Sequence, residues 1–192
     1  TVNGIATLRY LASRVDPVEI PLVVAPPAPT GTIDVNLNTG EDSLVDFATL
    51  RDLTLNSGAG LRFIEPGTYG RFTANSASGF AIGIPGATEP AVYNLQELTL
   101  NGADASIEVL GPVILTVASD VSINSAHVGD SEAPEILTLR IANGGLTLNG
   151  DSEFNGFVEA PEGSITVNGG STLRGCAQTD RLAVNGNALI TW

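Results

Sequence analysis

The chain alternates apolar and polar residues in a short string that recurs along most of its length. Each string closes on an Asn, as in Leu53-Thr54-Leu55-Asn56. Eight strings carry this residue, at Asn38, Asn56, Asn75, Asn101, Asn124, Asn149, Asn168 and Asn185. The numbers of successive Asn differ by 18, 19, 26, 23, 25, 19 and 17, by subtraction. Periods of this size are typical of proteins whose repeated units stack on one another.

The alternation within each string predicts a short β-strand. The positions one and three residues before the Asn are apolar in all eight strings, whereas seven of the eight residues between them are polar. A period of two turns one face of a strand inward and the other outward. Asn and the small residue after it tolerate left-handed backbone angles, so they suit a sharp corner. We interpret the eight Asn as turn positions whose side chains stack as an amide ladder.

Further apolar segments fill the rest of each repeat. Leu61 and Phe63 follow Asn56 at the fifth and seventh positions, and strands are also predicted at 111–117 and 136–141. A repeat of this length has room for three short strands and three turns. The sequence therefore predicts an all-β fold, a single-stranded parallel β-helix or β-solenoid, with about eight coils over residues 31–192. We expect right-handed crossovers, which parallel strands strongly prefer.

Residues 1–30 lack the string and are interpreted as a separate segment. Apolar residues recur there at helical spacing between a capping Asn and a terminating proline, in the order Asn3, Ile5, Leu8, Leu11, Val15 and Pro17. Terminal coils of solenoids need covering, because open strand edges pair with other chains. We expect an N-terminal capping helix over the first coil, with docking to a neighbouring subunit as the alternative. Residues 25–30 are expected to form a stiff Pro-rich connector.

The charge of the chain narrows the classes of partner. Its 21 acidic residues and eight Arg, with no Lys, give a net charge of −13. Such a surface repels phosphate backbones and anionic membranes, so no nucleic-acid partner is expected. No apolar run reaches the length of a membrane span, so we expect no membrane insertion of this fragment. The single Cys excludes a disulfide within the chain and leaves the compartment open.

Strings near the carboxyl end carry a family resemblance. LTLNG at 146–150 is followed by Gly156 to Pro161, by VNGG at 167–170 and by LRG at 173–175. This arrangement resembles the Asn/Gly-rich β-solenoid domains of exported bacterial surface proteins, including pilus-assembly-like proteins, and is distantly similar to bactofilins. The resemblance covers about residues 36–192 in repeat style and is specific between 146 and 187. It implies an exported bacterial protein with a structural or adhesive role, and it supplies no active site.

One cluster has residue types that suit metal or acid–base chemistry. His127, the only histidine, precedes Asp130, Glu132 and Glu135. Imidazole and carboxylates form metal sites and general acid/base pairs. Neither the spacing of a zinc-protease helix nor that of a calcium-binding loop is present. A solvated loop in one of the longer coils is therefore the favoured interpretation.

Parallel β-helices also include polysaccharide lyases and hydrolases, so an enzyme is an alternative. Arg174 and Arg181, near Asp180, come closest to a charged catalytic cluster. Lyase chemistry needs a cation or metal for the enolate, and hydrolysis commonly needs two facing carboxylates. Such residues are more often solvated ion pairs on an outer face. We therefore predict no enzymatic activity, no cofactor and no metal site.

The outward positions of the strings suggest one more kind of surface. A column of threonines at strand spacing would form a flat array suited to ice or a crystalline polysaccharide, and it comprises Thr54, Thr73, Thr99, Thr147 and Thr166. Ser122 and Ala183 interrupt this column, and Thr also suits any exposed strand. Cys176, at the eighth position after Asn168, is expected to be small, buried and inward rather than a nucleophile.

These observations predict an exported structural protein. We expect an extracellular or cell-surface location and self-association as a filament, appendage or matrix subunit, or an adhesin module. The chain begins at Thr1 with no recognisable signal peptide, and we interpret it as a mature or trimmed fragment. One alternative is a carbohydrate-binding or polysaccharide-processing β-helix. A second alternative is an ice-binding protein that uses the Thr and Asn face.

Overall fold

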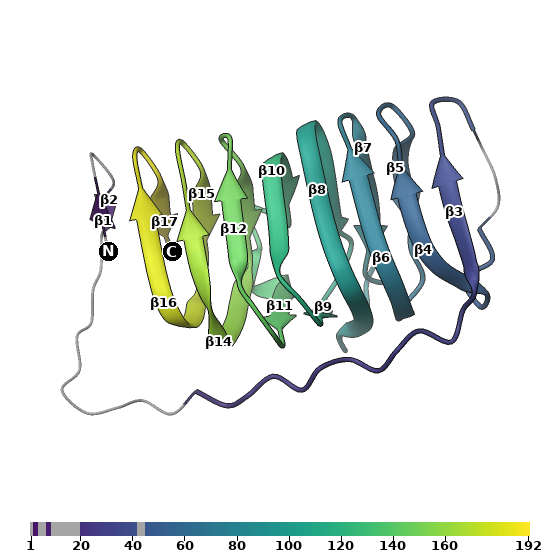
Figure 1. The fold of residues 1–192 in the computed structure, drawn as a ribbon, viewed down its shortest axis with the longest axis horizontal. Helices are drawn as coiled ribbons and strands as arrows, with labels where there is room; N and C mark the ends of the chain where they lie inside the picture. The colour runs from purple at the N-terminus through teal and green to yellow at the C-terminus, as the bar shows by residue number, and fades with distance from the viewer. Residues whose placement is uncertain (1, 4–6, 9–19, 42–44) are drawn as a thin grey trace.

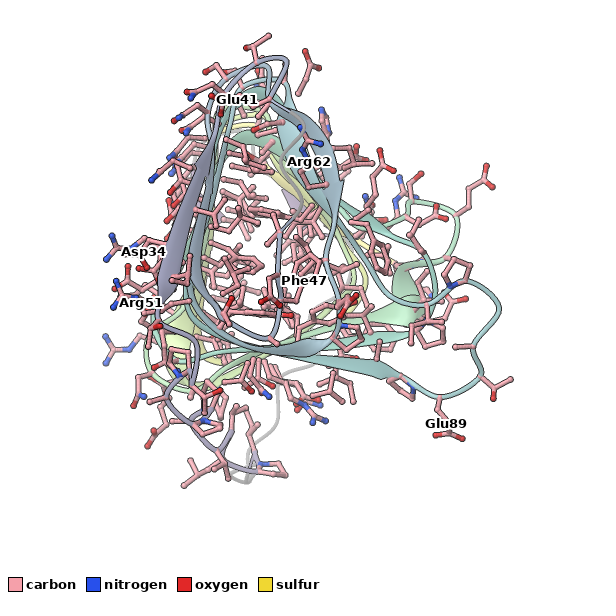
Figure 2. All side chains as sticks on the ribbon, turned by 90° about the vertical axis from the view of Figure 1, so that its right-hand side faces the viewer. Asp34, Glu41, Phe47, Arg51, Arg62 and Glu89 are labelled. Atoms are coloured by element: carbon pink, nitrogen blue, oxygen red, sulfur yellow. The ribbon has the colours of Figure 1, made fainter. Side chains whose placement is uncertain are left out.

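A computed structural model describes residues 2–3, 7–8, 20–41 and 45–192 of the chain. These residues form a parallel β-solenoid of about seven turns, seen from the side in Figure 1 and along its axis in Figure 2. The cross-section is triangular, so each turn, or coil, has three faces and three corners. The strand pairings of the described residues are all parallel. The predicted all-β parallel solenoid is confirmed.

The three faces share the strands in a regular order. The first face, here called the ladder face, carries the Asn strings and contains β3 (Ile33–Leu37), β4 (Leu50–Leu55), the second part of β6 (Gly67–Asn75), the middle of β8 (Ala91–Val109), the first part of β10 (Val121–Val128), β12 (Leu146–Asn149) and the ends of β14 (Phe157–Val167) and β16 (Ala177–Asn185). The second face contains β5 (Gly60–Phe63), β7 (Ser78–Ile82), β13 (Glu153–Asn155), β15 (Thr172–Arg174), β17 (Leu189–Thr191) and the ends of β8 and β10. The third face contains β9 (Val113–Val117), β11 (Leu137–Ile141) and the first parts of β6, β8, β14 and β16.

Helical structure is sparse in the part of the chain that the structure describes. A single 3-10 turn, η1 (Pro134–Ile136), precedes β11 in one of the longer coils. No helix within the described ranges has the length and apolar character needed to cross a membrane.

The apolar columns of the strings build the core. Leu55, Leu100 and Leu148, each directly before a ladder Asn, are fully buried and belong to one column that runs in register along the rod. Burial of one such side chain stabilises the fold by about 1.5–3 kcal/mol relative to exposure. Val35 and Leu182, at the two ends of the other column, are only partly buried because each lies in a terminal coil.

The structure has about seven turns, so the prediction of about eight coils is wrong. The eight Asn strings do lie on eight strands of one face, from β3 to β16. Eight stacked strands on one face enclose seven intervals, and each interval is one turn of the chain. The repeat count was therefore right for strands and one too high for turns.

The predicted N-terminal capping helix is also wrong for the residues that the structure describes. Asn3 lies in β1 (Val2–Asn3), which pairs with β16, and Leu8 lies in β2 (Thr7–Leu8), which pairs with β17. The other residues of the expected helix, Ile5, Leu11, Val15 and Pro17, lie outside the described residues. β1 and β2 thus pair with the last coil, whereas the helix was expected over the first. A strand satisfies the backbone N–H and C=O groups of a sheet edge, which a helix leaves unpaired.

A loop of the first coil covers the other end of the rod. Residues 45–49 turn inward, and Figure 2 shows Phe47 pointing into the triangular interior. The Phe47 ring lies 6.3 Å from the Tyr69 ring in an edge-on arrangement and packs against the core. Asp46 holds the turn, because its carboxylate accepts hydrogen bonds from the Ala48 N–H and the Thr49 hydroxyl. Aromatic burial and a side-chain-capped turn therefore close this end locally.

An extended segment connects the two ends along the outside of the rod. Residues 20–32 run from the last coil back towards the first, below the solenoid in Figure 1. Gln96 Nε2 donates a hydrogen bond of 2.9 Å to the Pro27 carbonyl, which holds this segment against the body. Leu22 and Val24 are 69% and 86% exposed, so the segment lies on the surface and adds little to the core.

Candidate functional site

The ladder Asn side chains form a hydrogen-bonded column at one corner of the solenoid. In the second half of the rod, each Nδ2 donates to the Oδ1 of the Asn one coil earlier. These bonds of 2.8–2.9 Å join Asn124 to Asn101, Asn149 to Asn124, Asn168 to Asn149, and Asn185 to Asn168. Both the donor and the acceptor of each inner amide are therefore used, as in the stacked amides of cross-β structures.

The column is interrupted at Asn75. Asn56 Nδ2 donates to Asn38 Oδ1 at 2.9 Å, but Asn75 Nδ2 donates to the Leu55 carbonyl at 3.2 Å. The corner geometry changes at this point. The residue with positive φ stands two places after Asn56 and Asn75, at Gly58 and Ala77, but directly after Asn101 and the later ladder residues. Asn75 shares the corner type of Asn56, and its hydrogen bond to the Leu55 carbonyl is what takes its amide out of the column.

The first end of the ladder has its own acceptor. Asn38 has no Asn one coil earlier, and its backbone N–H and Nδ2 donate to Glu41 Oε2 at 2.8 and 3.1 Å. These hydrogen bonds, the backbone one first, lower the pKa of the Glu41 carboxyl below its ordinary value of 4.5. The Arg62 guanidinium donates to the Glu41 carbonyl, so the same residue ties the first corner to the next coil.

The last end of the ladder meets the N-terminal strands. We call β1 and β2 together the N-terminal rung. Val2 stands in register with Val184 and Asn3 with Asn185, while Leu8 stands in register with Ile190. Asn3 therefore occupies the position that the next ladder residue would take. The rung continues the ladder face and the second face of the last coil by one further layer.

A sequence repeat at the N-terminus predicts this rung, although the spacing of the apolar residues there also fits a helix. Residues 1–9 (TVNGIATLR) match residues 166–174 (TVNGGSTLR) at seven of nine positions. The shared positions include the ladder residue, Asn3 and Asn168, and a leucine, Leu8 and Leu173, of which Leu173 is buried on the second face. The N-terminal segment is therefore a further copy of the repeat, and alignment on the Asn strings would have found it.

The His127 cluster does not assemble into a metal or acid–base site. His127 Nδ1 lies 3.6 Å from Glu153 Oε2 on the neighbouring coil, and both side chains are more than one third exposed. Asp130 instead accepts a hydrogen bond from the Glu132 N–H, which shapes the loop before η1, where Glu135 also lies exposed. Within the described part of the chain, no three His, Cys, Asp or Glu side chains gather closely enough to hold a metal ion. The geometry agrees with a solvated loop.

The structure separates the arginines of the second candidate cluster. Arg181 Nε lies 3.2 Å from Asp180 Oδ2 in an exposed pair of sequence neighbours. Arg174 lies on another face, in β15, in register with Asn155 and Thr191. Exposed ion pairs of this kind contribute about 0–1 kcal/mol and carry no particular chemistry.

The outward threonines stand in a straight column on the ladder face. Thr54, Thr73, Thr99, Ser122, Thr147, Thr166 and Ala183 are in register from coil to coil. Their side chains are half-exposed beside the ladder Asn. Charged residues lie about two positions earlier along these strands near the first end. There Arg51 Nε pairs with Asp34 Oδ1 at 2.9 Å, and Arg71 Nε pairs with Glu97 Oε2 at 2.6 Å.

Cys176 is exposed, so the expected buried position is wrong. The chain turns sharply at Gly175, whose φ is +128° and where an added Cβ would collide with the Gly156 carbonyl oxygen. The alternation continues unbroken from the buried Leu173 through the buried Gly175, so Cys176 falls on the outward side.

The chain matches no protein-family model, no curated protein and no solved structure.

Proposed function

We propose that the chain is a structural module of an extracellular filament, appendage or matrix, or of an adhesin, and that its copies associate with one another. The observation that carries this proposal is the last coil. Its edge is paired in register by a segment from the opposite end of the sequence, since Val2 stands opposite Val184. A sheet edge that accepts a remote strand in this way provides a joint that a second copy can also use.

The ends of the rod support an assembly role. Among the described strands, β3 pairs with β4, and β1 pairs with β16. Each end of the rod therefore presents a terminal layer of strands. Edges of this kind are templates for pairing with another chain.

The composition limits side-by-side aggregation. The net charge of −13 and the absence of Lys give the rod an acidic surface. Like charge on long β-faces disfavours irregular lateral association, so contact is directed to the ends. The exposed pairs at His127 and Arg181 give no support to catalysis, and we propose no enzymatic role.

Light scattering and negative-stain electron microscopy of the purified chain test this proposal. The protein is measured from about 10 µM to about 1 mM, because tethered segments have effective concentrations of about 10⁻³ M. Over this range the mass should rise above the 19.7 kDa of one chain. Images should show rods joined at their ends. Leu8→Asp should reduce the mass, whereas Thr99→Ala on the ladder face should leave it unchanged. A mass of one chain at every concentration, salt and divalent-ion condition would contradict the proposal.

The in-register threonine column favours one second candidate, an ice-binding surface. Threonines on parallel strands repeat at about 4.8 Å, and the half-exposed column beside the Asn ladder keeps that spacing from coil to coil. Thermal hysteresis and faceted ice growth would be measured for the protein and for Thr99→Lys. Hysteresis that the substitution abolishes would establish this role, and no hysteresis at about 10⁻³ M, the upper end of the range above, would exclude it.

A further inference from the structure

We propose that the N-terminal rung is exchangeable, so that the last coil of one copy accepts the rung of a second copy and links the two head to tail. This inference rests on the proposed structural role and names the partner surface for it. The acceptor is the open edge of β16 and β17, and the donor is the segment that contains β1 and β2.

The acceptor edge recognises the rung through the same features that join any two coils. β16 offers the parallel pairing positions of Val184 and Asn185, and β17 offers those of Leu189 and Ile190. Val184 is buried, whereas Leu189 and Ile190 are only half-buried in the terminal coil. The rung brings a Val, an Asn and a Leu to these registers, in a nine-residue sequence that nearly repeats an inner coil. Nothing in these pairings depends on whether the donor belongs to the same chain.

The connector is longer than pairing within one chain requires. Twenty-four residues, 9–32, separate Leu8 from Ile33, by subtraction of their numbers. At about 3.1 Å per residue, an extended Pro-rich segment of this length spans roughly 75 Å. Seven turns stacked about 4.8 Å apart make a rod of about 34 Å. The same connector therefore reaches the last coil of its own rod or that of a neighbour placed end to end.

The first end of the rod is covered by a loop of its own first coil. Phe47 covers the core there, and hydrogen bonds to the Asp46 carboxylate hold its loop. The corner of the first coil is stabilised as well, because the Glu41 carboxylate accepts a hydrogen bond from the Asn38 side-chain amide. At the last coil, the described segment that protects the edge is the rung. In this exchange the rung is therefore the donor and the last coil is the acceptor.

Local concentration decides between the two arrangements. Pairing within a chain and pairing between chains make the same contacts between the rung and the edge, so their balance depends mainly on the effective concentration that the connector provides. Flexible linkers give effective concentrations in the millimolar range, which fall as the linker lengthens. We expect mainly closed single chains near 10 µM, about a hundredfold below that range, and mainly linked chains above about 1 mM. A surface array or a matrix reaches such local concentrations.

A disulfide placed across the joint tests the exchange in the full chain. The variant carries Asn3→Cys and Asn185→Cys in a Cys176→Ser background. Adjacent parallel strands lie about 4.8 Å apart, inside the 4.4–6.8 Å Cα range of disulfides. Chains with normal and heavy nitrogen are mixed in denaturant, refolded together and oxidised at about 10 µM and about 1 mM, the two sides of the expected crossover. Mass spectrometry then counts linked peptides that combine the two labels, and light scattering measures the mass of the same samples.

The expected result is a concentration-dependent share of mixed-label peptides that join positions 3 and 185. This share should be near zero in the dilute sample. It should approach one half, the value for random pairing of two labels, in the concentrated sample. A matched control with Asn3→Cys and Asn124→Cys should form few such links, because Asn124 already has ladder partners on both sides.

Three results would overturn the exchange. Same-label peptides at both concentrations in samples that still associate would remove the exchange and keep the structural role on another surface. Same-label peptides in samples that stay at the mass of one chain would remove both. Absence of the 3–185 link, with free thiols at both positions, would show that the rung does not occupy this edge.

Discussion

The two ends of the rod are covered in different ways. The first end is covered by residues 45–49, which belong to the coil that they protect. The last end is covered by the N-terminal rung, which reaches it from the other end of the sequence along a surface connector. A local cover leaves only when its own coil unfolds, whereas a remote cover can move to another molecule without disturbing the core. The difference separates a permanent end from an exchangeable one.

The interiors behind these ends differ as well. Near the first end the core is aromatic, with Tyr69 and Phe72 stacked at 5.0 Å and Phe72 and Phe80 at 5.2 Å. Near the last end the coils share a continuous Asn ladder from Asn101 to Asn185. Ring packing therefore contributes more in the first half than in the second, and ladder hydrogen bonds contribute more in the second half than in the first.

The largest expected loss of stability comes from removing an aromatic ring from the core near the first end. Phe80→Ala should lower the free energy of unfolding by about 3–5 kcal/mol, because it leaves a cavity and removes the ring next to Phe72. The matched control, Phe154→Ala, empties an equally buried position near the last end. Phe80→Ala should be the costlier change by about 0.5–1.5 kcal/mol, the usual contribution of a ring contact. Urea titration measures both, and a larger loss for Phe154→Ala would contradict the comparison.

The next effect concerns the ladder half. Asn149→Ala removes one amide that donates to Asn124 and accepts from Asn168. The expected loss is about 1–3 kcal/mol, for two hydrogen bonds at about 0.5–1.5 kcal/mol each. Asn75→Ala, whose amide donates to the Leu55 carbonyl, should lose about half as much. Equal losses in thermal or urea unfolding would mean that the continuous ladder adds nothing to the second half.

A smaller effect opens the first end. Asp46→Ala removes the acceptor of the Ala48 N–H and the Thr49 hydroxyl, and should cost about 1 kcal/mol. Faster amide exchange should be confined to the first coil. Asp46→Asn, which keeps a side-chain oxygen, should retain most of the protection. Loss of protection in β16 or β17 would show that the two ends are not independent.

The smallest effect is the acid sensitivity of the first ladder corner. The folded pKa of Glu41 is lowered by its hydrogen bonds from Asn38, so its stabilisation is present above the ordinary carboxyl pKa and is lost as the pH falls through the folded value. An NMR titration should place the Glu41 midpoint below 4.5. Asn38→Ala keeps the backbone donor and should move the midpoint only part of the way back. A midpoint at or above 4.5 in the unmodified chain would contradict this cap.

Much of the fold could be predicted from residue order, because each column of the string had one physical requirement. The inward positions around Leu55 and Leu148 had to be apolar, and they are buried. The location of the terminal strands could not be read from apolar spacing. Leu8 fits a helical pattern as well as an inward strand position, and only the repeat in residues 1–9 separates the two. The outward position of Cys176 could have been read from the period of two that starts at Leu173, whereas counting from the distant Asn168 crosses a corner and loses the alternation.

Part of the candidate site could also be predicted from the sequence. The ladder positions follow from the Asn strings, but the departure of Asn75 does not, because Asn75 has the same corner as Asn56, which stays in the ladder. The edge that receives the rung required the pairing of two distant segments. The sequence around Val184 and Ile190 does not specify which strand pairs with β16 or β17, because the partner strands are far away in the chain.

Amide hydrogen exchange of the unmodified chain, compared with Leu8→Asp, tests most directly whether the rung covers the last coil. In the unmodified chain, the rung amides that face β16 and β17, one of each neighbouring pair (Val2 or Asn3, Thr7 or Leu8), should be protected, and β16 and β17 should exchange as slowly as strands in the middle of the rod. In Leu8→Asp, protection should fall in the rung and in β16 and β17 while β4 and β6 are unchanged. Unprotected rung amides in the unmodified chain, with β16 and β17 exchanging equally in both proteins, would contradict the account.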